Sequence, residues 1–150
     1  MRSSFYISTA CYLIKEDKVL LIKFNKKWGQ VYAPIGGKME NGETPTECVI
    51  REFKEETGLD LKNPKLKGIS YWKDSTEGVI FIYVAEDFEG NLQESEEGKL
   101  EWIDIKELEN IKQFDMNTKF TKYVLEEGMF EGKFILDNSA KVLEYKIRRI

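Results

Sequence analysis

Three glutamates within five residues could gather negative charge on one side of a helix. They are Glu52, Glu55 and Glu56, and the i, i+3 and i+4 spacing brings such side chains together on a helix surface. Carboxylates held close to one another repel, and the repulsion grows as water is removed. A cluster that has to stay ionised therefore favours a bound cation, and all-oxygen ligands favour Mg2+ or Mn2+ over zinc. The alternative is a solvated acidic face of a surface helix.

The residues around these glutamates predict the helix that the chemistry needs. Thr44 can cap the first free amides of a helix, and Glu47 can reach back to the amide of Thr44. Pro45 lies at the first helical position, where its missing amide hydrogen is not needed. Gly58 can take the left-handed conformation that ends a helix. The apolar side of the helix consists of Ile50, Phe53 and Thr57, with Val49 at its border.

Further positions around the three glutamates are fixed in type and spacing. The residues Gly37, Glu43, Arg51, Glu52, Glu55, Glu56 and Gly58 fit the pattern G-x5-E-x7-R-E-U-x-E-E-x-G-U, in which the bulky apolar U is Phe53 and Leu59. Chance would give such a match in about one chain in a million, or somewhat more often in a glutamate-rich chain. The pattern is the signature of the Nudix hydrolases, and on these residues the chain is identified as a member of that family.

The tail of the chain extends this resemblance beyond the signature. It is similar to MutT-type enzymes, especially the 8-oxo-dGTP diphosphatases and oxidised purine nucleoside triphosphatases. The segments that carry the likeness are Leu100-Glu101-Trp102, Phe114-Asp115-Met116-Asn117, residues 130–134 and residues 142–145. The resemblance implies Mg2+-dependent hydrolysis of a nucleoside triphosphate to the monophosphate and pyrophosphate, by in-line attack of water at an inner phosphorus. The role that it implies is the sanitation of the nucleotide pool.

The resemblance also implies a metal site. Its expected ligands are the backbone carbonyl of Gly36 and the carboxylates of Glu52, Glu55, Glu56 and Glu97, and these four glutamates are also the expected catalytic residues. Glu97 could ligate a cation or accept a proton from water. Because Glu94 and Glu96 lie in the same loop, an acid-rich loop without such a role is the alternative. Arg51 is expected to orient glutamates through an ion pair, while Gly37, Glu43 and Gly58 have structural roles.

Five other residues fall where such enzymes bind substrate: Lys23, Trp28, Trp72, Phe114 and Asn117. Lys23 matches a lysine near the triphosphate, although it could equally be an exposed residue at a strand end. Trp72 and Phe114 could stack on the base or pack in the core. Asn117 could read the polar edge of the base as donor and acceptor or cap the helix that follows. Trp28 could cover the base as a lid or anchor its own loop.

Two departures from the vertebrate enzymes bear on the choice of base. Met116 and Asn117 replace their paired acidic base readers, and Ala33 replaces an asparagine ahead of the glycines.

Oxidised purine triphosphates remain the expected substrate. The first alternative is an ordinary dNTP, or another nucleoside diphosphate derivative such as ADP-ribose or a dinucleoside polyphosphate. Subfamilies acting on ADP-ribose or dinucleoside polyphosphates carry a marker proline or tyrosine downstream, which the segment Asp74-Ser75-Thr76-Glu77-Gly78 lacks. The second is a module that senses a nucleotide without cleaving it; such modules usually lose signature glutamates, which are intact here.

Composition excludes several other classes of protein. The chain has no histidine, which removes Ser-His-Asp and Cys-His nucleophilic schemes and His-ligated zinc. A net charge of −4 over 150 residues argues against a broad nucleic-acid-binding face. Cys11 and Cys48 are expected to be small buried residues in a reducing cytosol. We find no signal-peptide pattern and no membrane span. We therefore expect one cytoplasmic domain, residues 1–150, acting on a small nucleotide as a monomer or homodimer.

The pattern of apolar residues predicts more strands than helices. Strands are expected at residues 5–14, 19–24, 66–72, 79–85, 100–103, 130–136 and 141–150, with a further short strand before the signature helix. Residues 25–34 and 86–98 read as loops, residues 105–110 as a helical turn and residues 117–127 as a helix. These elements predict an α+β fold with a mixed sheet packed between helices. That agrees with the α/β/α sandwich, with its loop-helix-loop signature, that the family resemblance implies.

Overall fold

A computed structural model describes residues 4–25 and 29–150 of the chain, and the predicted elements are present in it. The strands that the sequence predicted are β1 (Phe5–Lys15), β2 (Lys18–Phe24), β4 (Ile35–Lys38), β6 (Lys65–Lys73), β7 (Glu77–Ala85), β9 (Gly98–Asp104), β10 (Phe130–Leu136) and β11 (Val142–Arg149). The helices are α1 (Pro45–Thr57) and α2 (Asp115–Leu125), with one short 3-10 turn, η1 (Ile105–Glu107).

Three short strands lie in segments for which the sequence predicted no strand. They are β3 (Val31–Ala33), β5 (Asp60–Lys62) and β8 (Asp87–Glu89). The strand β3 extends the sheet beyond β2, while β5 and β8 pair with each other in a separate two-stranded sheet. Three residues are too few for alternation of apolar and polar side chains to be visible. These strands form because a distant partner is available, which the local sequence does not reveal.

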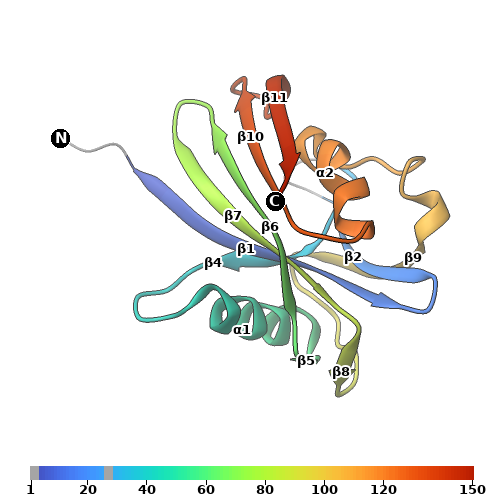
Figure 1. The fold of residues 1–150 in the computed structure, drawn as a ribbon. Helices are drawn as coiled ribbons and strands as arrows, with labels where there is room; N and C mark the ends of the chain where they lie inside the picture. The colour runs from blue at the N-terminus through green and yellow to red at the C-terminus, as the bar shows by residue number, and fades with distance from the viewer. Residues whose placement is uncertain (1–3, 26–28) are drawn as a thin grey trace.

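Nine strands of the described residues form one mixed sheet (Figure 1). The order of the main path is β11-β10-β6-β7-β1-β2-β3, with β4 paired to β1 and β9 to β2. The pairs β1–β7 and β6–β10 are parallel, and the other pairs are antiparallel. On its other side β1 pairs first with β4, through residues 8–11, and then with β2, through residues 13–15. The sheet therefore divides at β1, directly beside the glycines of β4.

The two helices cover opposite faces of this sheet (Figure 1). On one face, Val49 and Phe53 of α1 pack in a core with Leu13 of β1. On the other, Phe120 of α2 packs in a second core with Tyr12. Neighbouring residues of β1 therefore enter different cores, as alternation along a strand requires. The α+β prediction, with helices on both sides of a mixed sheet, is confirmed.

The helix α2 begins two residues earlier than the sequence predicted. Phe114 is its N-cap residue, without a side-chain capping bond. Asn117 lies inside the first turn with only 7% of its surface exposed, so the alternative in which it caps the helix is wrong. The helix buries Asn117, Phe120, Thr121 and Val124, whose i, i+3, i+4 and i+7 spacing defines one face. Asn117 therefore lies on the buried face of α2, although asparagine often occupies the cap position of a helix.

Candidate active site

The helix α1 is fixed at both ends by the contacts that the sequence predicted. The hydroxyl of Thr44 accepts a hydrogen bond from the Glu47 amide at 3.1 Å, and the Thr44 amide donates to the Glu47 carboxylate at 2.9 Å. Gly58 ends the helix with φ of 80°, and its N–H donates to the Lys54 carbonyl at 2.9 Å. The glutamates of the last turns therefore project from a helix whose length and orientation are set.

Two glycines of β4 allow a close approach between the sheet and this helix. Gly36 and Gly37 pair with Ala10 and Thr9 of β1. A Cβ atom on Gly36 would lie 2.0 Å from the carbonyl oxygen of Thr9, and one on Gly37 would lie 2.4 Å from Cδ of Glu52. Because no side chain fits in either place, the carboxyl group of Glu52 rests directly against the β4 backbone.

Burial has an electrostatic consequence for Glu52. Its side chain is 19% exposed, and the loss of hydration raises its pKa above the ordinary value. The ion pair with Arg51 opposes this rise, while the charges of Glu55 and Glu56 add to it. Burial therefore disfavours the charged form of Glu52, and a further cation beside it would favour that form.

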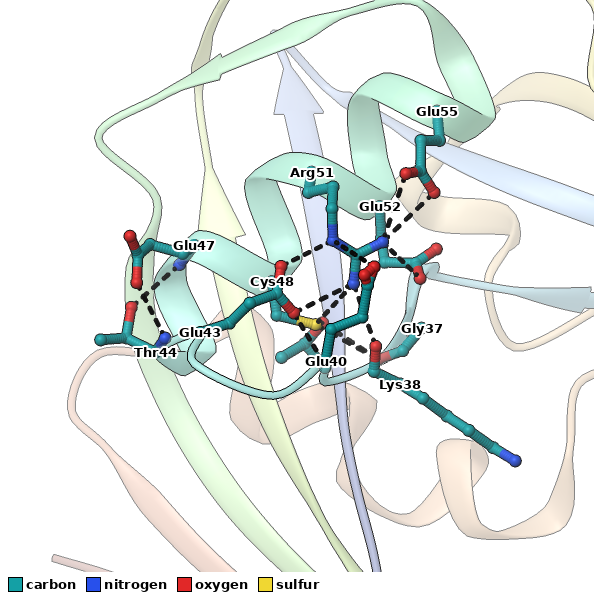
Figure 2. A network of polar contacts seen from close by, with 11 residues as sticks. Gly37, Lys38, Glu40, Glu43, Thr44, Glu47, Cys48, Arg51, Glu52 and Glu55 are labelled. Carbon is teal, nitrogen blue, oxygen red and sulfur yellow. Dashed lines mark hydrogen bonds and ion pairs between the residues drawn. The ribbon is translucent and has the colours of Figure 1, made fainter.

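Arg51 is the centre of the polar network on this side of α1 (Figure 2). It donates two hydrogen bonds to the carboxylate of Glu43, from Nε at 2.6 Å and from Nη2 at 3.0 Å. Its Nη1 donates to Glu52 at 3.1 Å and to Glu55 at 3.2 Å. Its Nη2 also donates to the carbonyl of Lys38 in β4 at 3.1 Å. Arg51 thus forms the expected ion pairs with glutamates and ties them to the glycine strand.

Arg51 also controls the ionisation of Glu43. The bonds from its guanidinium, followed by the bond from the Glu40 amide at 2.7 Å, lower the pKa of Glu43 to about 2. The side chain of Glu43 is only 15% exposed. Glu43 therefore stays charged over the whole range in which enzymes operate and keeps Arg51 in place.

We expect this ion pair to make stability depend on pH at the acidic end. The pKa of Glu43 is about 2 in the folded chain against an ordinary 4.5, so the unfolded chain binds more protons between these values. The contribution is complete above about pH 4.5 and is lost as the pH falls through about 2. Urea unfolding midpoints from pH 2 to pH 6 check this. The wild type should lose more stability on acidification than Glu43→Gln, and parallel curves would contradict the assignment.

Glu56 faces a different partner from the other two glutamates. It is half-buried, and the hydroxyl of Ser95 donates a hydrogen bond to its Oε1. The same hydroxyl accepts a bond from the amide of Glu97 at 3.1 Å. Glu97 itself is exposed in the acidic loop. The structure therefore brings the loop that carries Glu97 against the end of α1, as the predicted site requires.

The carboxylates of Glu52, Glu55 and Glu56 suit a hard divalent cation, although their oxygens are not yet arranged as a complete set of metal ligands. Within residues 4–25 and 29–150, no three acidic or thiol side chains already stand as a group of metal ligands. Glu52 and Glu55 meet on the same Nη1 atom of Arg51, whereas Glu56 is turned to Ser95. All these donors are carboxylate oxygens, which suit Mg2+ or Mn2+. The assignment of ligands, including the Gly36 carbonyl, stays a prediction.

A small cavity of about 220 Å³ lies on the opposite face of the sheet from α1. Its lining includes Thr9, Ala33, Phe114, Met116 and Asn117. The structure thus brings together two of the predicted base-binding residues, Phe114 and Asn117, with Met116 and Ala33, the other two positions at which the sequence departs from the vertebrate enzymes. One residue of this lining, Thr9, pairs with Gly37 of β4 in the sheet.

The remaining predicted substrate residues lie elsewhere. Trp72 stacks on Tyr6, with ring centroids 6.3 Å apart and planes at 13°, and it is not among the residues that line the cavity. Nζ of Lys23 lies 5.5 Å from the centre of the Tyr32 ring, at the end of β2. Trp28 falls outside the described residues. For Trp72 and Lys23, contact with substrate stays a prediction.

Comparison with known proteins decides the family. The model of the NUDIX domain matches residues 5–145. This chain belongs to the Nudix family. It is 37% identical over 147 residues to YvcI of Bacillus subtilis, an uncharacterized Nudix hydrolase, covering 93% of this chain and 92% of that one. The chain is therefore a Nudix hydrolase that acts on nucleotides.

Solved structures and further relatives place it near MutT. The crystal structure of a MutT protein from Bacillus halodurans superimposes with a TM-score of 0.89 at 31% identity, over 95% of this chain and 97% of that one. The oxidized purine nucleoside triphosphate hydrolase of Danio rerio is 25% identical over 146 residues, covering 95% of this chain and 94% of its own length. Relatives matched over shorter stretches have other names, including ADP-ribose pyrophosphatase and NAD-capped RNA hydrolase.

Three contacts around the Nudix signature were not anticipated from the sequence. The Ser95 hydroxyl binds Glu56. The hydroxyl of Thr9 donates to the Gly37 carbonyl at 3.4 Å and lies 3.3 Å from Sγ of Cys48. Cys48 is buried and free, as expected, yet it touches the strand that carries the glycines. No local signal reveals these contacts, because each joins residues far apart in the sequence.

Neither helix in the described part of this Nudix chain is long and apolar enough to cross a membrane.

Proposed function

We propose that this Nudix hydrolase cleaves nucleoside triphosphates to the monophosphate and pyrophosphate with Mg2+ or Mn2+, and that it prefers oxidised purine deoxynucleotides such as 8-oxo-dGTP. The observation that carries the proposal is the relation between the cavity and the glutamates. The cavity that Phe114 and Asn117 line adjoins β1, and β1 pairs with the glycines on which Glu52 rests. In this proposal a base in the cavity extends its phosphates past the place where the sheet divides at β1, toward the acidic helix.

The glutamates divide the work in this proposal. Glu52, Glu55 and Glu56, with the Gly36 carbonyl and Glu97, hold the divalent ion. A bound Mg2+ or Mn2+ supplies positive charge against the anionic phosphates and makes water more acidic. Water attacks an inner phosphorus in line, its proton passes to a carboxylate of this group, and pyrophosphate leaves with the bonding electrons.

The cavity favours recognition of a neutral base. The side chain of Asn117 offers a donor and an acceptor, and no hydrogen bond within the described residues uses its amide. Met116 replaces an acidic reader with a thioether, which accepts a weak bond from Ser70 at 4.0 Å. Phe114 adds an aromatic face beside them. The similarity to the Danio rerio hydrolase, which is named for oxidised purine nucleoside triphosphates, supports the same class of substrate.

We expect Asn117→Ala to lower kcat/KM for 8-oxo-dGTP by about 10- to 100-fold, because loss of a buried polar partner typically destabilises binding by ~1–3 kcal/mol. A substrate held mainly through its phosphates should lose much less. Steady-state kinetics with 8-oxo-dGTP and dTTP measure this ratio. Asn138→Ala, at an exposed turn, serves as the control. An equal loss for both nucleotides would argue against reading of the base by Asn117.

A second candidate activity is hydrolysis of a diphosphate linked to another group, such as ADP-ribose or a dinucleoside polyphosphate. One observation favours it: the ADP-ribose pyrophosphatase of Methanocaldococcus jannaschii is 37% identical over 99 residues, which covers 63% of this chain. A module that binds a nucleotide without cleaving it is the less favoured alternative, because all signature glutamates are intact.

A substrate panel separates these activities. We would compare kcat/KM for 8-oxo-dGTP, other oxidised purine triphosphates, the four ordinary dNTPs, ADP-ribose and a dinucleoside polyphosphate, each with and without Mg2+. The proposal predicts the highest value for an oxidised purine triphosphate. A higher value for ADP-ribose would favour the second candidate activity. If no substrate were turned over, the result would favour a module that binds a nucleotide without cleaving it.

A further inference from the structure

The acidic loop at residues 90–97 is attached directly to the end of α1. The amide of Gln93 donates to the carbonyl of Thr57, the last residue of the helix, at 2.8 Å. Gly58 lies so close to the loop that a Cβ atom there would stand 2.7 Å from the Gln93 side chain and 2.9 Å from the Asn91 carbonyl. A loop rich in carboxylates is thus held against a helix end that is itself rich in carboxylates.

Ser95 joins the two acidic segments through one neutral group. Its hydroxyl donates to Oε1 of Glu56 and accepts from the amide of Glu97 at 3.1 Å. A hydroxyl can donate once and accept as well, so both bonds can form together. An anchoring lysine would lower the negative charge of the site, whereas a serine holds the carboxylate and leaves the charge unchanged.

We propose that Ser95 is a positioning residue, which orients the Glu56 carboxylate and holds the backbone of Glu97 so that the loop and α1 present their carboxylates to one ion. The ion rests on the proposed function, but the role of Ser95 goes beyond it. With Oε1 of Glu56 held by Ser95, its Oε2 is left for the ion. Partners that orient metal-binding side chains in this way typically change metal affinity by about 10- to 100-fold when they are removed.

The experiment measures Mn2+ binding to the nucleotide-free protein by electron paramagnetic resonance of the unbound ion. Ser95→Ala should weaken binding by about 10-fold, while Ser95→Thr, which keeps the hydroxyl, should bind within a few-fold of the wild type. Ser75→Ala, at an exposed turn between β6 and β7, is the matched control and should bind normally. Thermal unfolding and circular dichroism confirm that each variant is folded.

A second readout separates positioning from a structural role. In turnover, Ser95→Ala should raise the Mg2+ concentration for half-maximal rate more than it raises the nucleotide KM. Unchanged Mn2+ binding in Ser95→Ala, or an equal loss in Ser95→Thr, would overturn the inference, as would a wild type that binds no Mn2+. If Mn2+ binding depends on the hydroxyl but no nucleotide is cleaved, the inference stands and the proposed function fails.

Discussion

Replacing Glu56 by glutamine is expected to remove most of the turnover while the fold survives. A side chain that transfers a proton in the transition state typically contributes about 10²- to 10⁴-fold to the rate. The neutral amide can neither accept that proton nor supply negative charge to hold an ion. Glutamine has nearly the same shape and can still accept the bond from Ser95, so the position of the loop should be kept. The measurement is kcat for the preferred triphosphate at saturating Mg2+, with thermal unfolding of the same preparation.

The control for Glu56→Gln changes the net charge equally and leaves the site intact. Glu109→Gln, at an exposed residue after η1, should keep the wild-type kcat. A near-normal rate for Glu56→Gln would refute the role of Glu56. A strongly lowered unfolding temperature would instead show that the variant had lost structure, and the more conservative Glu56→Asp would then be compared.

Arg51→Lys is expected to lower kcat/KM by about 10- to 100-fold, as removal of a partner that orients metal-binding side chains does. The guanidinium bonds Glu43 with two nitrogens and reaches Glu52 and Glu55 with a third. One ammonium keeps the charge but cannot reproduce this fork. Two carboxylates should therefore lose their fixed orientation. We also expect the stability of Arg51→Lys to fall less on acidification than that of the wild type, because Glu43 loses the partner that lowers its pKa.

The same substitution at another ion pair distinguishes local geometry from general charge. Arg148 pairs with Glu131 on β11 and β10, with side chains 64% and 49% exposed. Arg148→Lys should leave both kcat/KM and stability close to the wild type, since exposed pairs contribute ~0–1 kcal/mol. Activity of Arg51→Lys as high as that of Arg148→Lys would contradict the orienting role of Arg51.

The acidic helix could be predicted from the sequence because its determinants are local. Thr44 and Glu47 are three residues apart and form hydrogen bonds to each other, and Gly58 ends the helix by its own backbone conformation. The partnership of Arg51 with glutamates was also predictable, since Glu52 and Glu55 lie one and four residues away. Such contacts form on any helix of this sequence, whatever the rest of the chain does.

Contacts between distant segments could not be predicted in this way. Ser95 and Glu56 are 39 residues apart, and nothing in a polar loop indicates which serine meets the helix. The position of Asn117 depended on the face that α2 turns to the sheet, which its preference for caps did not indicate. Trp72 could stack on a base or in the core. It lies beside Tyr6 because β6 and β1 flank β7, where Trp72 and Tyr6 both pair with Gly78.

In the proposed function, catalysis depends most on the acidic side chains of α1, which hold a divalent ion against a polyphosphate. The most direct measurement is product analysis of a nucleoside triphosphate after incubation with Mg2+, with a chelator, and with the chelator followed by excess Mg2+. We predict monophosphate and pyrophosphate with Mg2+, no product with the chelator, and full recovery when Mg2+ is restored. Undiminished hydrolysis in the chelator would contradict the account.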